Sequence, residues 1–325
     1  MNLPAARSRA TTAALVSASA LILAGCAAFS DDAGSDSGTG GQVAAAFYPL
    51  QYVAERVAGE FYDVENLTPA GKESHDLELT IKETAVLSKA DLVVFEKGYQ
   101  PGVDEAVEQN ATGETLDVAE VVELLPPAEH DGEEHHDDEH AEEEHAADDG
   151  HDHGDLDPHF WQDPVRMADL GDAVAEKLAE LNPDHQADYT KNAKALRSDL
   201  ETLDGEYTEG LKSCERDVVV VSHDAFGYLA KYGLHLEPIA GLSPDAEPTP
   251  AGLADLQHLI EEEGVTTVFY ETLVSPKFAQ TLADDAGAEA AVLDPVEGLT
   301  DDTAGEDYLS LMRSNLAALE KANGC

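Results

Sequence analysis

The chain has 325 residues, with 68 Asp and Glu against 18 Lys and Arg, so its formal net charge is −50. A surface this acidic repels nucleic acid and anionic membranes and attracts cations, which argues against nucleic-acid binding. The length is sufficient for two lobes after a leader and a linker.

The N-terminus has the pattern of a secretory signal. Arg7 and Arg9 precede an apolar run from Ala13 to Ala24, which is too short and too rich in alanine for a stable membrane span. The letters LAGC, ending at Cys26, resemble a bacterial lipobox, in which this cysteine becomes the lipidated first residue. We expect a signal peptide over 1–25 and an extracytoplasmic, lipid-anchored protein, with an ordinary cleaved signal as the alternative. The polar residues 26–42 are typical of a flexible tether.

Strands and helices alternate in the first half of the chain. VAAAF, from Val43, predicts a buried strand with a turn at Pro49, and QYVAERVAGEF predicts an amphipathic helix. ADLVVFEKG predicts a second buried strand. This alternation indicates a parallel α/β sheet, and we expect the N-terminal lobe to cover 43–181.

An insertion in this lobe, from Glu129 to Asp157, contains fifteen acidic residues and no Lys or Arg. It also holds seven of the thirteen histidines of the chain: His130, His135, His136, His140, His145, His151 and His153. So few apolar residues predict disorder, and a disordered loop binds metal only weakly because ordering costs about 1–2 kcal/mol per residue. We interpret the loop as an accessory metal site; the alternative is a solvated acidic loop.

A long helix is predicted between the two halves. The break at Asn182-Pro183 ends one helical region, and apolar residues then recur every three or four positions from Tyr189 to Leu211. A helix over 182–212 would be about 45 Å long at about 1.5 Å per residue, long enough to join two lobes.

The second half, 213–325, repeats the alternation of strands and helices. The expected fold is therefore α/β, with two doubly wound lobes joined by one long rigid helix and a metal cleft between them. Cys214 and Cys325 are an even pair in an exported chain, which suggests a disulfide; two free thiols are the alternative.

Four polar residues lie at or near predicted strand ends, where open α/β sheets bind ligands. His223 follows VVVVS, Asp294 follows AAVL, and His159 and His75 precede helices. Glu271 ends VTTVFYE, and we expect it to hydrogen-bond near the site or between lobes.

The surroundings of these residues resemble the zinc/manganese group of bacterial ABC-transporter substrate-binding lipoproteins. SHDLELT resembles its PHDYEPS-type segment, DPHFWQDP its DPHxWLDP motif, and SHDAFGYLAKYGL its HxAFxYLAxxYGL motif. GLSPDAEPTPAGLADLQHLIEEEGVTTVFYE and VLDPVEGL match two further blocks. The resemblance implies a metal between two lobes, with ligands at His75, His159, His223 and Asp294, and it supports the Cys214–Cys325 disulfide.

The sequence departs from the family pattern at two places near these ligands. Ser74 stands where the family usually has proline, and is expected to loosen the loop that carries His75. VEG follows Asp294-Pro295, where the family usually has Leu-Gly.

Three imidazoles and one carboxylate favour four-coordinate Zn²⁺, whereas Mn²⁺ prefers more oxygen ligands. Manganese binders of the resembling family often carry glutamate where His223 stands, which also favours zinc. The resemblance implies a monomeric, non-enzymatic protein that delivers zinc to an ABC importer permease. The alternatives are a manganese or iron homologue, a zinc reservoir or metallochaperone, and a zinc hydrolase, although no HExxH motif is present.

Overall fold

A computed structural model of the protein describes residues 40–127 and 156–325. The predicted signal peptide, the lipidation site Cys26, most of the tether and the seven histidines of the acidic loop lie outside the described residues. No helix of the described part of the chain is long and apolar enough to cross a bilayer.

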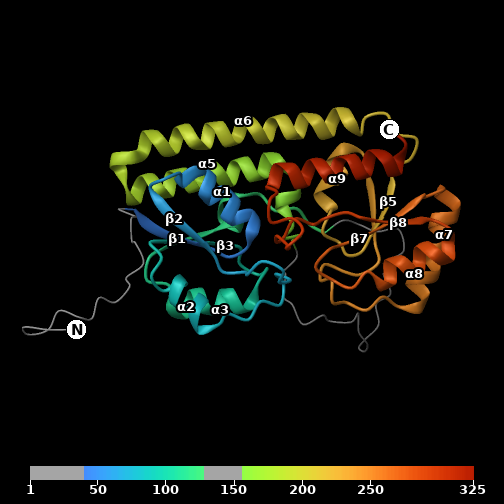
Figure 1. Cartoon of the computed structure of the whole chain (residues 1–325), viewed down its shortest axis with the longest axis horizontal. Coiled ribbons are helices and arrows are strands. Elements are labelled where there is room, and N and C mark those ends of the chain that lie inside the picture. Colours follow the sequence, from blue (N-terminus) through green and yellow to red (C-terminus); the bar gives the residue numbers. More distant parts are fainter. Residues whose placement is uncertain (1–39, 128–155) are drawn as a thin grey trace, which may run out of the picture. The chain divides into compact units, whose positions relative to one another are not determined.

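Two four-stranded parallel sheets form the centres of two α/β lobes, as expected (Figure 1). The first sheet has the strand order β2-β1-β3-β4 and the second has the order β6-β5-β7-β8. In each sheet the order reverses beside the first strand, which is the topology of a doubly wound fold.

The elements of the first lobe are β1 (Gly41–Ala45), α1 (Tyr48–Ala58), β2 (Tyr62–Asn66), α2 (Ile81–Leu87), β3 (Leu92–Phe95), α3 (Pro101–Asn110), β4 (Glu114–Asp117), α4 (Val118–Val121), the 3-10 helix η1 (Phe160–Gln162) and α5 (Pro164–Leu181). The strand predicted from Val43 begins two residues earlier, at Gly41, so the last two residues of the expected tether belong to β1. Pro49 lies in the first turn of α1 rather than in a separate turn, a position where its missing N–H costs nothing.

A short 3-10 helix η2 (Pro183–His185) and the long α6 (Gln186–Gly210) connect the lobes. Helix α6 has 25 residues, and its buried residues, among them Tyr189, Leu196 and Tyr207, are those of the predicted apolar face. Figure 1 shows α6 alongside α5 and α9. The hydrogen bond from Asn192 Nδ2 to Val57 O holds α6 to the first lobe, and that from Tyr207 Oη to Met312 O holds it to the second.

The second lobe contains β5 (Val218–Val221), the 3-10 helix η3 (Gly227–Tyr232), β6 (His235–Pro238), α7 (Pro250–Glu263), β7 (Thr267–Tyr270), α8 (Lys277–Ala286), β8 (Glu289–Val292) and α9 (Tyr308–Asn323). The 3-10 helix η3 ends where Gly233 adopts a φ of 87°. The disulfide joins Cys214 and Cys325, as expected. The exact lobe boundaries at 181/182 and 212/213 stay predictions.

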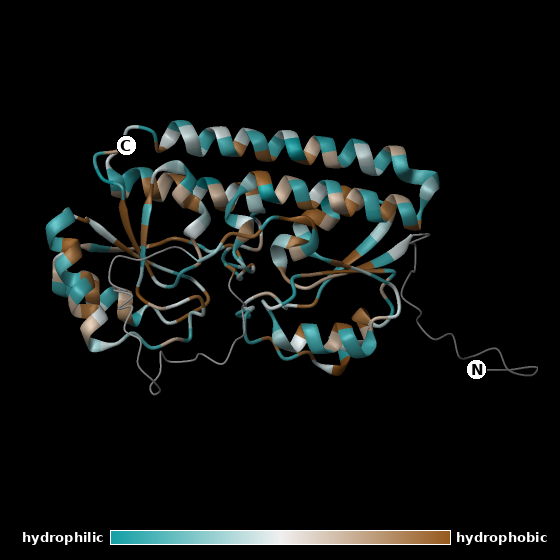
Figure 2. Cartoon of the chain, turned by 180° about the vertical axis from the view of Figure 1, so that it is seen from behind, coloured by the Kyte–Doolittle hydropathy of each residue, from teal (hydrophilic) through white to brown (hydrophobic). Residues whose placement is uncertain are grey.

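One apolar core runs through both lobes. Its members come from β1, α1, β3 and α5 of the first lobe and from β5, η3 and α9 of the second. In Figure 2 each sheet contains brown, hydrophobic strands beside strands that are mostly teal or white. A second, smaller cluster around Ile260 and Val268 lies between α7, α8 and the second sheet.

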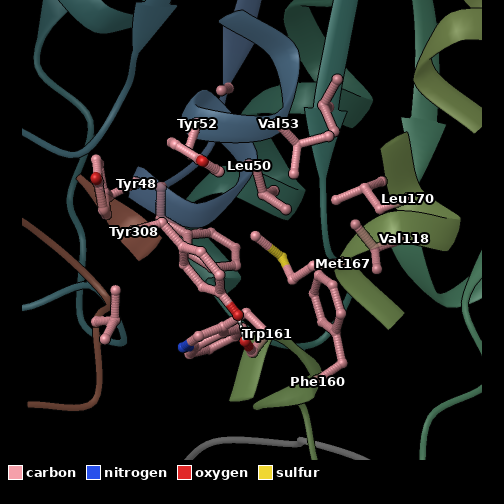
Figure 3. Packing of buried hydrophobic residues seen from close by; sticks show 14 of the residues in the cluster. Tyr48, Leu50, Tyr52, Val53, Val118, Phe160, Trp161, Met167, Leu170 and Tyr308 are labelled. Carbon is pink, nitrogen blue, oxygen red and sulfur yellow. Dashed lines mark hydrogen bonds between the residues drawn. The ribbon is translucent and has the colours of Figure 1, made fainter. Parts of the chain in front are cut away.

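Helix α9 supplies a connection between the lobes that the sequence did not suggest. Its first residue, Tyr308, stacks on Tyr52 of α1 with ring centroids 5.4 Å apart, and its hydroxyl donates to Trp161 O at 2.5 Å (Figure 3). Lys231 of η3 also contacts Asp163 of the first lobe at 2.8 Å. These contacts and the shared core favour small adjustments of the lobes over a wide hinge motion.

Candidate metal centre

Three histidines and one glutamate from four separate segments come together between the lobes. His75 precedes α2, His159 precedes η1, His223 follows β5, and Glu297 follows β8. One ligand atom from each of the four lies within 4.8 Å of all the others. All four side chains are buried, with at most 2% of each residue exposed.

Four of the six distances between the donor atoms lie close to those of a tetrahedral metal site. His75 Nε2 lies 3.4 Å from His159 Nε2, and Glu297 Oε1 lies 3.6 and 3.8 Å from these two nitrogens. His223 Nε2 lies 3.4 Å from the same oxygen. Zinc bonds of about 2.0–2.2 Å would place tetrahedral ligands about 3.3–3.6 Å apart. The cluster therefore needs little rearrangement to hold a four-coordinate cation.

His159 is oriented by a carboxylate two residues before it. Asp157 Oδ1 accepts a hydrogen bond of 2.9 Å from the backbone N of His159 and lies 2.8 Å from ring Nδ1. A carboxylate accepts hydrogen bonds, so Nδ1 carries the proton and Nε2 keeps its lone pair for a metal. Asp157 was not predicted as a site residue, although it is the first residue of the DPHFWQDP motif.

His223 is oriented in the same way by Glu271, which directly follows β7. Glu271 Oε1 contacts ring Nδ1 of His223 and accepts a hydrogen bond from Ser222 Oγ. Burial alone would lower the pKa of His223, but the charge and hydrogen bond of Glu271 outweigh it and raise this pKa well above the ordinary value. Of the two roles expected for Glu271, the structure thus supports hydrogen bonding beside the site.

Glu297 faces the histidines with one oxygen and a serine with the other. The Oε2 atom of Glu297 accepts a hydrogen bond of 3.1 Å from Ser74 Oγ. Within the described residues, neither Glu297 Oε1 nor His223 Nε2 makes a hydrogen bond. Burial would raise the pKa of Glu297, but the close approach of His223 Nε2, at 3.4 Å, and the charge of His75 hold this pKa well below the usual range. The two buried atoms that lack hydrogen bonds are thus potential metal donors.

Asp294, the expected fourth ligand, is absent from this group of donors, and Glu297 stands in its place. Asp294 Oδ1 instead accepts a hydrogen bond of 2.8 Å from Val296 N, and its backbone N and O pair with the amide of Asn315 at 2.9 and 2.6 Å. Burial raises the pKa of Asp294 to about 6. The side chain therefore closes a local turn.

This turn directs Glu297 toward the histidines. Val296 has a φ of 62°, which is unusual and strained for a β-branched residue. Trp161 Nε1 and Gln162 Nε2 both donate to Pro295 O, at 2.8 and 2.6 Å, and so fix the turn from the first lobe. The side chains of Trp161 and Phe160, which directly follow His159, are buried.

Ser74 does not loosen the loop that carries His75. It is fully buried, its Oγ lies 2.6 Å from Tyr99 Oη, and its backbone O accepts a hydrogen bond of 2.8 Å from Gln100 Nε2. The remaining histidines of the described chain lie outside the cluster. His185 stacks on Phe61, His235 is in β6, and His258 is exposed on α7.

Comparison with known proteins identifies the family. The family model described as "zinc-uptake complex component A periplasmic" matches residues 43–322. The chain belongs to this family. The zinc-uptake component A family is one of transport proteins that bind metal, and the match covers the part of the chain that carries the resemblance.

Several relatives of the zinc-uptake component A family are similar along most of the chain. The zinc-binding lipoprotein AdcA of Streptococcus pneumoniae is 35% identical over 85% of this chain. The chain spans about half, 54%, of the length of that relative. The high-affinity zinc uptake system protein ZnuA of Bacillus subtilis is 35% identical over 94% of this chain and 95% of its own length.

The solved structures confirm the fold. The Zn(II)-bound ZnuA-like domain of S. pneumoniae AdcA has a TM-score of 0.70, with 32% identity over 88% of this chain and 100% of that domain. The laminin-binding protein Lmb of Streptococcus agalactiae, described as an adhesin with metal-transporting activity, has a TM-score of 0.74 and 29% identity over 87% of this chain and 99% of its own.

Proposed function

We propose that this protein captures one Zn²⁺ ion with His75, His159, His223 and Glu297 and delivers it to the permease of an ABC importer. The observation that carries the proposal is the buried group of four donors, whose spacing fits tetrahedral zinc. Three nitrogen donors and one oxygen suit zinc better than manganese, which prefers oxygen ligands and higher coordination. The names of the zinc-binding relatives agree with this choice of metal.

The same geometry disfavours a hydrolase. A catalytic zinc site keeps one position open for water, whereas four protein donors here complete a tetrahedron. We therefore propose that the zinc ion is the transported cargo and that the protein is a carrier without catalytic activity.

The first test is zinc titration of the full-length protein against a chelating competitor, compared with the His223→Ala variant. The unchanged protein is expected to show one tight site, which the variant loses. His258→Ala is the matched control, because His258 is exposed and outside the cluster. Equal tight binding by His223→Ala would contradict the proposal.

The acidic loop supplies a second test. All four proposed ligands lie outside residues 129–150, so deleting this segment is expected to leave one tight zinc ion per protein. Loss of that ion would instead identify the loop as the main site and favour a zinc reservoir. Several ions of equal affinity in the intact protein would favour the same alternative.

We also infer that lipid on Cys26 holds the protein at the outer face of the cell membrane as a monomer. The relatives named lipoproteins support the anchor. Cys26→Ala is expected to release the protein into the medium, and light scattering of the released protein should give the mass of one chain.

A further inference from the structure

Two buried hydroxyl groups connect the first lobe to the carboxylate of Glu297. Tyr99 Oη lies 2.6 Å from Ser74 Oγ, which in turn lies 3.1 Å from Glu297 Oε2. Ser74 and Tyr99 are fully buried and Glu297 is 2% exposed, so water does not compete for these contacts. The chain of hydroxyls therefore crosses between the lobes beside the metal cluster.

The direction of these hydrogen bonds follows from the number of protons. A carboxylate that faces a metal site can only accept, so the single hydroxyl proton of Ser74 points to Glu297 Oε2. Ser74 Oγ then has only lone pairs to offer Tyr99, so the tyrosine hydroxyl donates to it. Tyr99 thus donates to Ser74, and Ser74 donates to the carboxylate of Glu297.

The backbone of Ser74 is itself held in place by a hydrogen bond from Gln100. Gln100 Nε2 donates to Ser74 O at 2.8 Å and to Thr68 Oγ1 at 3.1 Å, and Thr68 Oγ1 donates to Ala46 O at 2.7 Å, directly after β1. The Tyr99 ring also packs on the His75 ring, with centroids 4.7 Å apart. The position of Oγ is therefore fixed by the sheet of the first lobe rather than by the loop alone.

This arrangement uses the two oxygens of Glu297 differently. Oε2 is occupied by Ser74, and Oε1 faces the three imidazoles at 3.4–3.8 Å. A carboxylate can bind a metal with one oxygen or with both. One oxygen completes a four-coordinate zinc site, whereas two oxygens raise the coordination number and add the oxygen character that manganese prefers.

We propose that Ser74, supported by Tyr99, is a positioning residue that restricts Glu297 to a single metal bond and so favours zinc over manganese. The inference rests on the proposed function, because it assumes that the cluster holds the metal.

The test compares Ser74→Ala with the unchanged full-length protein. Affinities for Zn²⁺ and Mn²⁺ are measured by competition, and the visible absorption of bound Co²⁺ reports the coordination number, since four-coordinate Co²⁺ absorbs far more strongly than five- or six-coordinate Co²⁺. A hydrogen bond to a charged group corresponds to about a 10- to 100-fold change in an equilibrium constant. We expect Ser74→Ala to reduce the preference for zinc over manganese by about this factor and to weaken the Co²⁺ bands.

Two further variants keep the test decisive. Tyr99→Phe removes only the supporting donor and is expected to shift both readouts in the same direction by a smaller factor, even if Ser74→Ala folds poorly. Ser198→Ala, exposed on α6, is the matched control and should change neither readout.

The outcomes separate the inference from the proposed function. Tight zinc binding by the unchanged protein, together with equal losses for both metals and an unaltered Co²⁺ spectrum in Ser74→Ala and Tyr99→Phe, would overturn only the inference. Failure of the unchanged protein to hold zinc at the cluster would overturn both.

Discussion

Asp157 Oδ1 accepts two hydrogen bonds from His159, one from its backbone N and one from its ring Nδ1. Asp157 is itself held by its backbone, because its N donates to Leu125 O at 2.7 Å and its O accepts from Tyr228 Oη of the second lobe at 2.7 Å. The orientation of one metal-facing imidazole thus depends on contacts from both lobes. Glu271 plays the equivalent part for His223.

Replacing Asp157 with alanine is expected to weaken zinc binding by about 10- to 100-fold, the usual effect of losing a partner that orients a ligating histidine. The ring of His159 would be free to rotate and to take the wrong tautomer. Asp157→Asn keeps an oxygen acceptor and should retain most of the affinity. Competition titration measures both, and circular dichroism checks that the fold is intact. Unchanged affinity in Asp157→Ala would show that His159 needs no such partner.

Asp294 and Glu297 are expected to respond differently to loss of their charge. Glu297→Gln should weaken zinc binding strongly while leaving the metal-free protein nearly as stable, because the amide fits the same space. Asp294→Asn keeps the oxygen that caps Val296 N and should bind zinc almost normally. Titration of the two variants separates a ligand from a residue that shapes the turn. The reverse ranking would restore Asp294 as the ligand.

The fold was predictable where the sequence has strong apolar patterns. The strands around Val43, Val93 and Val220 and the apolar face of α6 were found because they are buried in the core. The strands β2, β4 and β6 were missed because each lies at the edge of its sheet and carries polar residues, such as YDVEN in β2. Edge strands show little of the apolar pattern that reveals a central strand.

The three histidines could be placed from their motifs, but the fourth donor could not. Asp294 lies just after a strand, where ligands of α/β sheets are usually found. Its position gives no indication of the turn that follows, in which Val296 has a positive φ. That turn carries the chain back and brings the later Glu297 to the cluster. The only sequence signal was the segment VEG after Pro295, which places a carboxylate three residues after Asp294.

Glu96 should destabilise the folded protein increasingly as the pH rises. It is 2% exposed at the end of β3, and within the described residues neither carboxylate oxygen makes a hydrogen bond. Burial, together with the charges of Asp157, Asp117 and Asp104, raises the pKa of Glu96 well above its ordinary value. In the unfolded chain the group ionises at its ordinary pKa, so the stability of the fold falls between that value and the folded pKa.

Glu96→Gln removes this charge without changing the shape of the side chain. The variant is expected to lose less stability than the unchanged protein between pH 4.5 and pH 8, by about 1.4 kcal/mol for each unit by which folding raises the pKa of Glu96. Thermal melts in the presence of a chelator measure both. Glu108→Gln, exposed on α3, is the control. A stability gain that does not depend on pH would contradict an ionisation of Glu96.

The Cys214–Cys325 disulfide is expected to stabilise the fold without affecting zinc binding. It closes a loop with a sequence separation of 111, which corresponds to about 4–5 kcal/mol in the chain-entropy model. Cys214 precedes β5 whereas His223 follows it, so the disulfide lies at the opposite end of the strand from the cluster. The double variant Cys214→Ser/Cys325→Ser should therefore melt at a lower temperature but still bind one zinc ion at 25 °C.

The C-terminus keeps its hydrogen bonds from Glu215 N and Arg216 N to Asn323 O, which favours a folded protein without the disulfide. Calorimetry with and without a reductant tests this prediction: the reductant should lower the melting temperature of the unchanged protein and leave that of the double variant unaltered. A loss of zinc in the double variant under conditions where it remains folded would show that the disulfide also shapes the metal centre.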